Sequence, residues 1–131
     1  MAEPTWLTRQ IVAMIHSAQI AEHGGSLGVR DEALIESALA RPENKWQYEP
    51  DADLFTIAAA YGYGLTKNHG FIDGNKRVGY MAAYVFLGLN GFDVDAAEPE
   101  VVLTMVDLAS GTLSEEQFSA WLRTHAVPAT S

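Results

Sequence analysis

Two apolar segments on either side of a short polar loop constrain the fold of this 131-residue chain more than any other feature. The two segments run from about Asp51 or Asp53 to Asn68 and from Asn75 to about Leu89. They are apolar on almost every face of a helix, and only residues 69–74 separate them. A helix that is apolar all round belongs in the interior of a protein. The sequence therefore predicts two buried helices that form a hairpin around this loop. Gly62 and Gly64 in the first helix let a neighbouring backbone approach closely.

Four further segments have the three- and four-residue spacing of apolar side chains that is typical of helices. Residues that start or stop helices mark the expected boundaries: Thr8 and Gly24 for the first helix, Asp31 and Pro42 for the second, Asp51 or Asp53 and Asn68 for the third, Asn75 and Asn90 for the fourth, Pro99 and Gly111 for the fifth, and Ser114 with Gln117 for the start of the sixth. A polar loop is expected at residues 42–50, and only this loop and residues 91–95 have room for short strands. The predicted class is all-α, a compact bundle of about six helices in a single domain of residues 1–131.

The composition is that of a soluble globular protein, with 48% hydrophobic and 19% charged residues. The chain has no cysteine, which excludes disulfides, thiolate metal sites and a cysteine nucleophile. No window approaches the apolar length of a membrane span, and residues 1–6 lack the layout of a signal peptide. We expect a cytoplasmic protein that does not bind membranes.

Charge is distributed unevenly along the sequence. The net charge of -9 opposes binding to a phosphate backbone, so we expect no direct nucleic-acid binding. Residues 67–77 nevertheless hold three of the eight basic residues, namely Lys67, Lys76 and Arg77, with His69 beside them. This local excess predicts a site for a small anion.

The loop at residues 68–77 combines groups that few structural roles require together. The first-turn amides of the fourth helix lie at the positive end of its dipole, and with Gly74 they can surround a phosphate. Lys76 and Arg77 are cations at the helix end that disfavours cations, unless an anion compensates. A histidine side chain ordinarily titrates near neutral pH, so His69 can accept the proton of an attacking hydroxyl. The loop therefore has the parts of a phosphate-transfer site.

Asp73 allows two interpretations, which are compatible with each other. A carboxylate beside a phosphate is repelled unless a divalent cation lies between them, and Mg²⁺ typically takes one or two carboxylates together with phosphate oxygens. Asp73 is also placed to be the N-cap of the fourth helix. Of its neighbours, Phe71 is expected to point inward and anchor the loop, and Ile72 is expected in the core.

Other residues that carry chemistry have simpler readings. His16 and His23 are seven residues apart on one helix with no carboxylate at ligand spacing, and His125 lies in the tail, so structural roles are expected for all three. Trp46 and Tyr48 allow two roles, packing against the core or holding a partner peptide.

The segment His69 to Arg77 resembles the signature of the Fic family, H-x-F-x-D/E-G-N-x-R. It is most similar to the death-on-curing (Doc) branch, in which G-N-K-R replaces G-N-G-R. The resemblance extends upstream through residues 22–25, 30–32 and 37–42 and downstream through residues 86–91, so it covers most of the chain. It implies a compact helical Fic-like fold.

The resemblance also implies roles for the loop residues. His69 is implied to be the general base and Asp73 the Mg²⁺ ligand, and nucleotide phosphates are held by Gly74, Asn75, Lys76 and Arg77. Most Fic proteins transfer AMP from ATP to a Ser, Thr or Tyr hydroxyl. Gly70 stands where most Fic sequences have proline, which is expected only to loosen the loop.

Two departures from the Fic pattern bear on the reaction. Lys76 replaces the glycine that leaves room for the phosphates, and Tyr80 replaces the second arginine that grips them. In the Doc branch these departures accompany a reversed nucleotide and transfer of the γ-phosphoryl group. The resemblance thus implies a kinase toxin that phosphorylates a threonine of elongation factor Tu and inhibits translation. An AMP transferase is the alternative, and an inactive binding module is the second alternative, although His69, Asp73 and Asn75 are all present.

Fic enzymes that inhibit themselves carry an S/T-x-x-x-E-G/N segment whose glutamate blocks the phosphate site. The single comparable pair here, Glu43-Asn44, has Leu39 at the Ser/Thr position. No built-in inhibitor is visible. The resemblance therefore implies a toxin-antitoxin pair in which a Phd-type antitoxin lays a helix in a groove.

Overall fold

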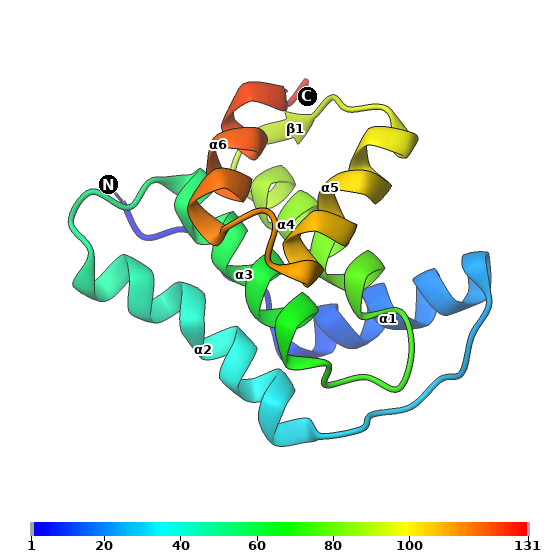
Figure 1. Ribbon diagram of the computed structural model, residues 1–131. Coiled ribbons are helices and arrows are strands. Elements are labelled where there is room, and N and C mark those ends of the chain that lie inside the picture. The colour runs from blue at the N-terminus through cyan, green and yellow to red at the C-terminus, as the bar shows by residue number, and fades with distance from the viewer. Residues whose placement is uncertain (1, 131) are drawn as a thin grey trace.

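The computed structural model describes residues 2–130 and confirms the all-α class. Six helices and one two-stranded sheet occupy these residues (Figure 1). In chain order the elements are α1 (Arg9–His23), α2 (Glu32–Tyr48), α3 (Leu54–Asn68), α4 (Asn75–Leu89), β1 (Phe92–Val94), α5 (Glu98–Ser110), α6 (Glu115–His125) and β2 (Ala126–Pro128).

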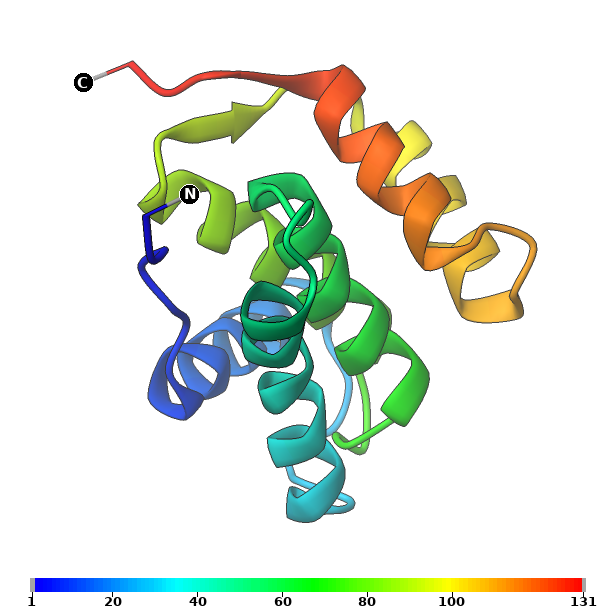
Figure 2. The same ribbon diagram turned by 90° about the vertical axis from the view of Figure 1, so that its left-hand side faces the viewer.

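Helices α3 and α4 form the predicted hairpin at the centre of the molecule. In Figure 1, α1 and α2 lie below this hairpin and α5 and α6 lie above it, and the turned view in Figure 2 shows the same arrangement. The close approach expected at the glycines of α3 is present, because a Cβ at Gly62 would lie 2.7 Å from the Phe118 ring, and one at Gly64 would lie 3.2 Å from Ala38. The loop that joins α3 and α4 is thus carried by the two most buried helices.

Most helix boundaries follow the predicted capping residues. The side chains of Thr8, Asp31 and Asp53 accept hydrogen bonds from first-turn amides of α1, α2 and α3. Ser114 and Gln117 form the capping box of α6. These local signals therefore fix where the helices begin.

The prediction that the second helix ends at Pro42 is wrong. Helix α2 continues through Pro42 to Tyr48, so neither the loop nor the strand considered at residues 42–50 exists. Proline costs a helix about 3 kcal/mol because one hydrogen bond is lost. Contacts on both sides of the proline offset this cost: Arg41 and Lys45 pair with Glu115 of α6, and Trp46 packs edge-on against Trp6. The packing interpretation thus holds for Trp46, whereas Tyr48 is 72% exposed.

The small sheet pairs β1 with β2 in antiparallel register, Asp93 opposite Val127. β1 lies in the predicted range, but β2 at the end of the chain was not expected. An isolated bridge joins Val29 to Phe71, which connects the loop after α1 to the loop between α3 and α4. In the described part of the chain no helix has the length and apolar character needed to cross a membrane.

Candidate active site

The loop between α3 and α4 is bound along its length by the segment that precedes α2. The backbone amides of Arg30 and Asp31 both donate to the Gly70 carbonyl, at 2.8 and 3.0 Å. The Ile72 amide donates to the Gly28 carbonyl at 3.1 Å. The expectation that Gly70 loosens the loop is wrong. Glycine is required there because a Cβ would clash with Ile35 near the start of α2. The candidate site is therefore a fixed loop.

Phe71 anchors this loop, as predicted. It is 2% exposed, and its ring stacks on His16 of α1 with centroids 3.9 Å apart. The Asn75 side chain accepts a hydrogen bond from the Phe71 amide and donates one to the Phe71 carbonyl, each at 3.0 Å. The expectation for Ile72 is wrong, since it is 53% exposed. Phe71 takes the inward position, and the next side chain of the extended segment points outward across Gly28.

His69 is exposed and adopts a left-handed backbone conformation with φ of 52° at the end of α3. Its Nδ1 lies 3.2 Å from the carbonyl oxygen of Thr66. A carbonyl can only accept, so this contact requires the proton to be on Nδ1. Nε2 then carries the free lone pair, and no hydrogen-bond partner of Nε2 is found among residues 2–130. The imidazole is in the tautomer that a general base needs.

Asp73 is exposed and fixed at two points. Its Oδ2 accepts a hydrogen bond from the Ser26 amide at 2.8 Å, and its carbonyl lies 3.0 Å from Nε2 of His16. Asp73 is not the N-cap of α4, because Gly74 holds that position with φ of 81° and no side chain caps the helix. The carboxylate is therefore free of a capping role and faces solvent.

A magnesium ion fits these residues. Mg²⁺ is commonly held by one or two carboxylates and phosphate oxygens, not by a cage of protein ligands. Asp73 supplies one ordered carboxylate, and no cluster of three metal-ligating side chains occurs in the described residues. An ion at this site would therefore need the phosphates of a bound nucleotide.

The first turn of α4 presents backbone donors beside Asp73. The Val78 amide is the first to bond within the helix, to Gly74 at 2.9 Å, which leaves the amides of Asn75, Lys76 and Arg77 without intrahelical acceptors. The Asn75 side chain is occupied by Phe71, so only its backbone amide is available here. Lys76 is exposed, and Arg77 donates to the Gly24 carbonyl at 3.2 Å. These donors and cations are arranged so that they could surround a phosphate, and we refer to them as the phosphate cradle.

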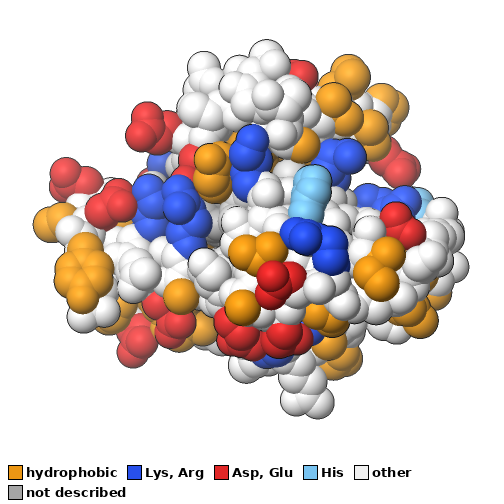
Figure 3. All heavy atoms as spheres, turned by 60° about the horizontal axis from the view of Figure 1, so that its bottom comes forward, with side chains coloured by type: hydrophobic (Ala, Val, Ile, Leu, Met, Phe, Trp, Pro, Cys, Tyr) orange, Lys and Arg blue, Asp and Glu red, His pale blue; other side chains and the backbone are white. Residues whose placement is uncertain are grey.

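Figure 3 shows that Lys and Arg side chains gather around an exposed histidine on the lower face of the molecule. Lys67 lies on α3, and Lys76 and Arg77 lie on α4, the two helices that meet at the loop. This basic face belongs to a protein with a net charge of -9. The charge distribution therefore favours an anionic ligand at the loop over one elsewhere on the surface.

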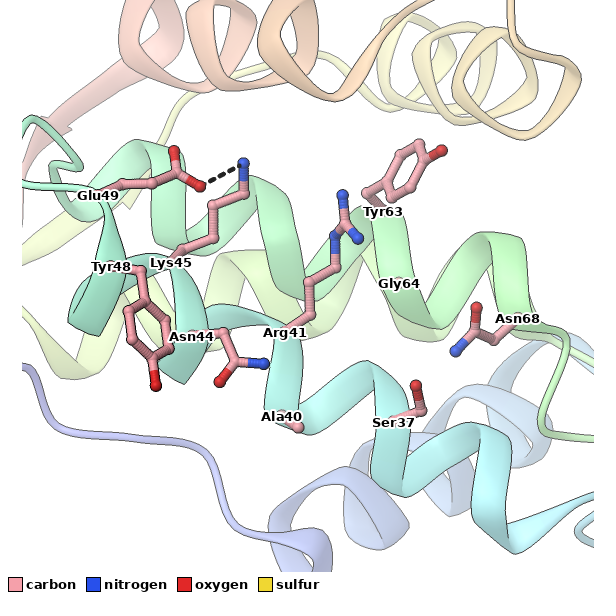
Figure 4. A pocket seen from close by; sticks show the side chains of 10 residues that line it. All are labelled: Ser37, Ala40, Arg41, Asn44, Lys45, Tyr48, Glu49, Tyr63, Gly64 and Asn68. Atoms are coloured by element: carbon pink, nitrogen blue, oxygen red, sulfur yellow. Dashed lines mark ion pairs between the residues drawn. The ribbon is translucent and has the colours of Figure 1, made fainter.

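A polar hollow of about 500 Å³ runs between α2 and α3 and begins at Asn68, the residue before His69 (Figure 4). Arg41 lies over the Tyr63 ring at 4.8 Å and pairs with Glu115, and Lys45 pairs with Glu49. The charges in this hollow are thus matched within the protein.

A second groove of about 680 Å³ lies between α1, α4 and α5 and is mostly apolar. Its rim includes Lys76 and Arg77, so it adjoins the phosphate cradle. Its apolar lining consists mainly of Tyr80, Met81, Tyr84, Val101, Val102, Met105 and Val106. Val102 and Val106 are exposed, which is unusual for apolar side chains side by side on one helix.

Comparison with known proteins identifies the family of this loop. The model of the Fic/DOC family matches residues 6–87, which include α1 to α3, the whole loop and all of α4 except its last two residues. The chain belongs to the Fic/DOC family. The resemblance of the His69 to Arg77 segment is thereby confirmed.

Curated relatives place the chain near the Doc proteins of this family. The chain is 41% identical to Toxin Doc of Mycolicibacterium smegmatis over 112 residues, which cover 77% of the chain and 85% of that relative. It is 33% identical to Protein kinase doc of Escherichia phage P1 over 109 residues, which cover 83% of the chain and 86% of that relative. The similarity therefore extends over most of each protein.

The Fic/DOC motif has its second arginine replaced by Tyr80 in this chain, and the structure gives this residue a different environment. Tyr80 lines the apolar groove. The centroid of its ring lies 6.1 Å from that of Tyr84 and 6.3 Å from that of Trp121. Burial raises the pKa of Tyr80 to about 12. A neutral phenol cannot grip phosphates as a guanidinium does.

Three residues outside the motif support the Fic/DOC loop and were not predicted as site residues. His16 binds Asp73 and Phe71, Ser26 binds the Asp73 carboxylate through its amide, and Arg30 binds the backbone of His69. These contacts join residues that are about 40 to 60 positions apart, and sequence spacing does not reveal such contacts. For Arg30 alone the sequence offered a signal, because residues 30–32 resemble the family.

Proposed function

We propose that this protein is a Doc-type toxin that transfers the γ-phosphoryl group of ATP to a hydroxyl group of another protein. The observation that carries the proposal is the free Nε2 of His69, on a fixed loop whose other end is the amide-rich start of α4. A general base and a phosphate cradle on one loop match the needs of phosphoryl transfer. The name Protein kinase doc of the phage P1 relative supports the same reaction.

In the proposed reaction, Nε2 of His69 accepts the proton of the substrate hydroxyl. The substrate oxygen forms a bond to the γ-phosphorus, the bond from this phosphorus to the oxygen bridging it to the β-phosphorus breaks, and ADP leaves with the electron pair. The amides of residues 74–77 and the side chains of Lys76 and Arg77 hold the phosphates.

Asp73 is the residue that holds Mg²⁺ in this proposal, and Ser26 fixes the orientation of its carboxylate. When bound, the ion neutralises charge on the phosphate oxygens. His16 holds the backbone of Asp73, so the carboxylate stays in place without being a cap. We infer that removal of Mg²⁺ abolishes transfer.

Lys76 and Tyr80 favour transfer of phosphate over transfer of AMP. Lys76 puts a long cation where an AMP-transferring Fic protein has a glycine, and Tyr80 removes the second guanidinium. Both changes oppose the nucleotide orientation that exposes the α-phosphate. AMP transfer is the competing proposal, and an inactive binding module is the third.

A threonine of elongation factor Tu is the proposed acceptor, and inhibition of translation is the proposed outcome. The support for this target is the resemblance of the G-N-K-R segment and of the chain as a whole to Doc proteins. The reaction takes place in the cytoplasm, where both ATP and the translation machinery are present.

A Phd-type antitoxin is the proposed partner, and the groove between α1, α4 and α5 is its proposed site. The groove presents exposed Val102 and Val106 and adjoins Lys76, so an amphipathic helix bound there would lie beside the phosphate cradle. Leu39 at the Ser/Thr position before Glu43-Asn44 departs from the inhibitory S/T-x-x-x-E-G/N pattern, which supports a separate inhibitor.

The test is a transfer assay with elongation factor Tu, using ATP labelled at the γ-phosphate in one reaction and at the α-phosphate in another. We expect label from the γ-position only, with mass spectrometry showing a phosphothreonine. The His69→Ala variant serves as the matched negative control. Label from the α-position would establish the AMP transferase instead, and no label from either position, with no ATP binding, would favour the inactive module.

A further inference from the structure

Arg30 is an exposed arginine outside the motif whose guanidinium binds two backbone carbonyls of the active-site loop. Its Nε donates to the carbonyl of His69 at 2.6 Å, and its Nη2 donates to the carbonyl of Asn68 at 3.1 Å. We propose that Arg30 is the positioning residue that holds His69 in its catalytic orientation. The proposal rests on the kinase function proposed above.

His69 needs such support because its backbone conformation is unfavourable. Among residues 2–130 it is the one non-glycine residue with positive φ, at 52°. Helices that end in this conformation usually have glycine there, since a Cβ is crowded in it. This position cannot be glycine here, because the proposed reaction needs the imidazole of His69 as its general base. The Arg30 guanidinium binds the carbonyls on both sides of the strained residue, which favours the left-handed conformation over its alternatives.

The same orientation fixes the tautomer of the imidazole. The turn at His69 brings Nδ1 to the Thr66 carbonyl, one turn back in α3, at 3.2 Å. This hydrogen bond is what leaves Nε2 unprotonated and accessible. A His69 backbone that relaxed to another conformation would move the ring away from Thr66. Arg30 thereby acts on Nε2 without touching the substrate.

Arg30 is itself held in place, so its effect on His69 is specific. Its amide and that of Asp31 bind the Gly70 carbonyl, and Gly70 packs directly against Ile35. Asn68 donates to the Leu34 carbonyl at 2.9 Å. These bonds tie residues 68–70 to the start of α2, so the arginine side chain leaves the backbone at a fixed distance from its targets.

The Arg30 guanidinium forms its hydrogen bonds with the carbonyls of His69 and Asn68. No carboxylate lies within ion-pair distance of its guanidinium in the described part of the chain. The guanidinium lies at the negative end of the α3 dipole, where a cation is stabilised. Lysine could supply the charge but not the two parallel N–H donors. The geometry therefore calls for arginine at this position.

The test is a double-mutant cycle between Arg30 and His69 in the transfer assay. Arg30→Ala is expected to lower kcat about 10- to 100-fold, because a misplacement of about 1 Å has this effect, and to leave the Kd for ATP unchanged. In the His69→Ala background, Arg30→Ala is expected to cause no further loss beyond about twofold. Arg30→Lys should recover only part of the lost rate.

The matched control is Arg123→Ala. Arg123 is an exposed arginine of α6 that binds Asp53, the N-cap at the opposite end of α3 from His69. The substitution should leave kcat unchanged even if it lowers the melting temperature. The proposal is overturned if Arg30→Ala leaves kcat within about twofold of the parent, or lowers the rate equally with and without His69.

A measurement without substrate separates this inference from the proposed function. The ¹⁵N chemical shifts of the His69 ring report its tautomer in the free protein. We expect Nδ1–H in the parent and a mixture of tautomers in Arg30→Ala. If the parent transfers neither phosphate nor AMP, the proposed function fails, and the ring shifts alone decide the role of Arg30. Identical His69 shifts in the parent and in Arg30→Ala would refute the positioning role.

Discussion

The imidazole of His16 stacks on the ring of Phe71, with centroids 3.9 Å apart and planes inclined by 20°. Nε2 of the same imidazole lies 3.0 Å from the carbonyl of Asp73, two residues further along the loop. One side chain of α1 thus supports the loop on either side of the exposed Ile72. Because a carbonyl only accepts, Nε2 of His16 donates this hydrogen bond.

His16→Ala should therefore destabilise the protein, because it leaves the Asp73 carbonyl without its donor and removes the stacking partner of Phe71. We expect a loss of about 1–3 kcal/mol in the free energy of unfolding, measured by urea denaturation. The matched control is His23→Ala on the same helix. His23 is exposed, so its loss should change the stability by less than about 0.5 kcal/mol. Equal effects of the two substitutions would contradict the supporting role of His16.

His69→Ala should lower the transfer rate to a small residual value while the protein remains folded and binds ATP. A general base typically contributes about 10²- to 10⁴-fold in rate, and the phosphate cradle is formed by other residues. Transfer is measured with γ-labelled ATP, and binding is measured by titration calorimetry. Transfer at the parental rate would refute the general-base role and return His69 to a structural one.

The site was largely predictable because its chemistry is contiguous in the sequence. His69, Phe71, Asp73 and the start of α4 occupy one loop, and the apolar helices that carry the loop are strongly periodic. The capping residues of α3 and α6 are local signals of the same kind. Features that depend on residues close together in the chain, such as helix caps and the composition of the loop, could thus be predicted from the sequence.

What could not be predicted depends on contacts between distant segments. Pro42 is a helix-breaking signal, but the ion pairs of α2 with Glu115, together with the packing of Trp46 against Trp6, keep the helix continuous. Ile72 is apolar, yet its direction is set by Phe71 and by the pairing with Gly28. Asp73 loses its expected role as a cap because Ser26, in a different loop, binds its carboxylate. In each case a tertiary contact overrides a local preference.

Asp53 is the N-cap of α3, and its contribution to stability should depend on pH. Burial by itself would raise the pKa of Asp53, but hydrogen bonds from Thr56 and Arg123 outweigh it and the pKa lies below its ordinary value. The carboxylate therefore stabilises the fold above its unfolded pKa of about 3.9, and this stabilisation is lost as the pH falls through the lower pKa of the folded state.

Asp53→Ala should accordingly lower the free energy of unfolding by about 1 kcal/mol at neutral pH, and by progressively less in acid. Urea denaturation of parent and variant, repeated down to the lowest pH at which both remain folded, measures the difference. Asp53→Asn keeps a capping oxygen and should lose less. A difference between parent and Asp53→Ala that stays constant with pH would show that the charge of the carboxylate is unimportant.

Gly79 and Gly88 lie on the same helix, α4, and should respond to alanine in opposite directions. A Cβ at Gly79 would lie 2.8 Å from the Gly62 carbonyl and closer still to the hydroxyl of Thr66, so α3 and α4 would have to separate. A Cβ at Gly88 would meet nothing within 4 Å. Gly79→Ala should lower the stability by about 1–3 kcal/mol or more, whereas Gly88→Ala should raise it by about 0.5–1 kcal/mol because alanine favours the helix. The melting temperatures of the two variants measure this contrast. A Gly79→Ala variant as stable as Gly88→Ala would mean that the hairpin carrying the active-site loop is packed less closely than its backbone indicates.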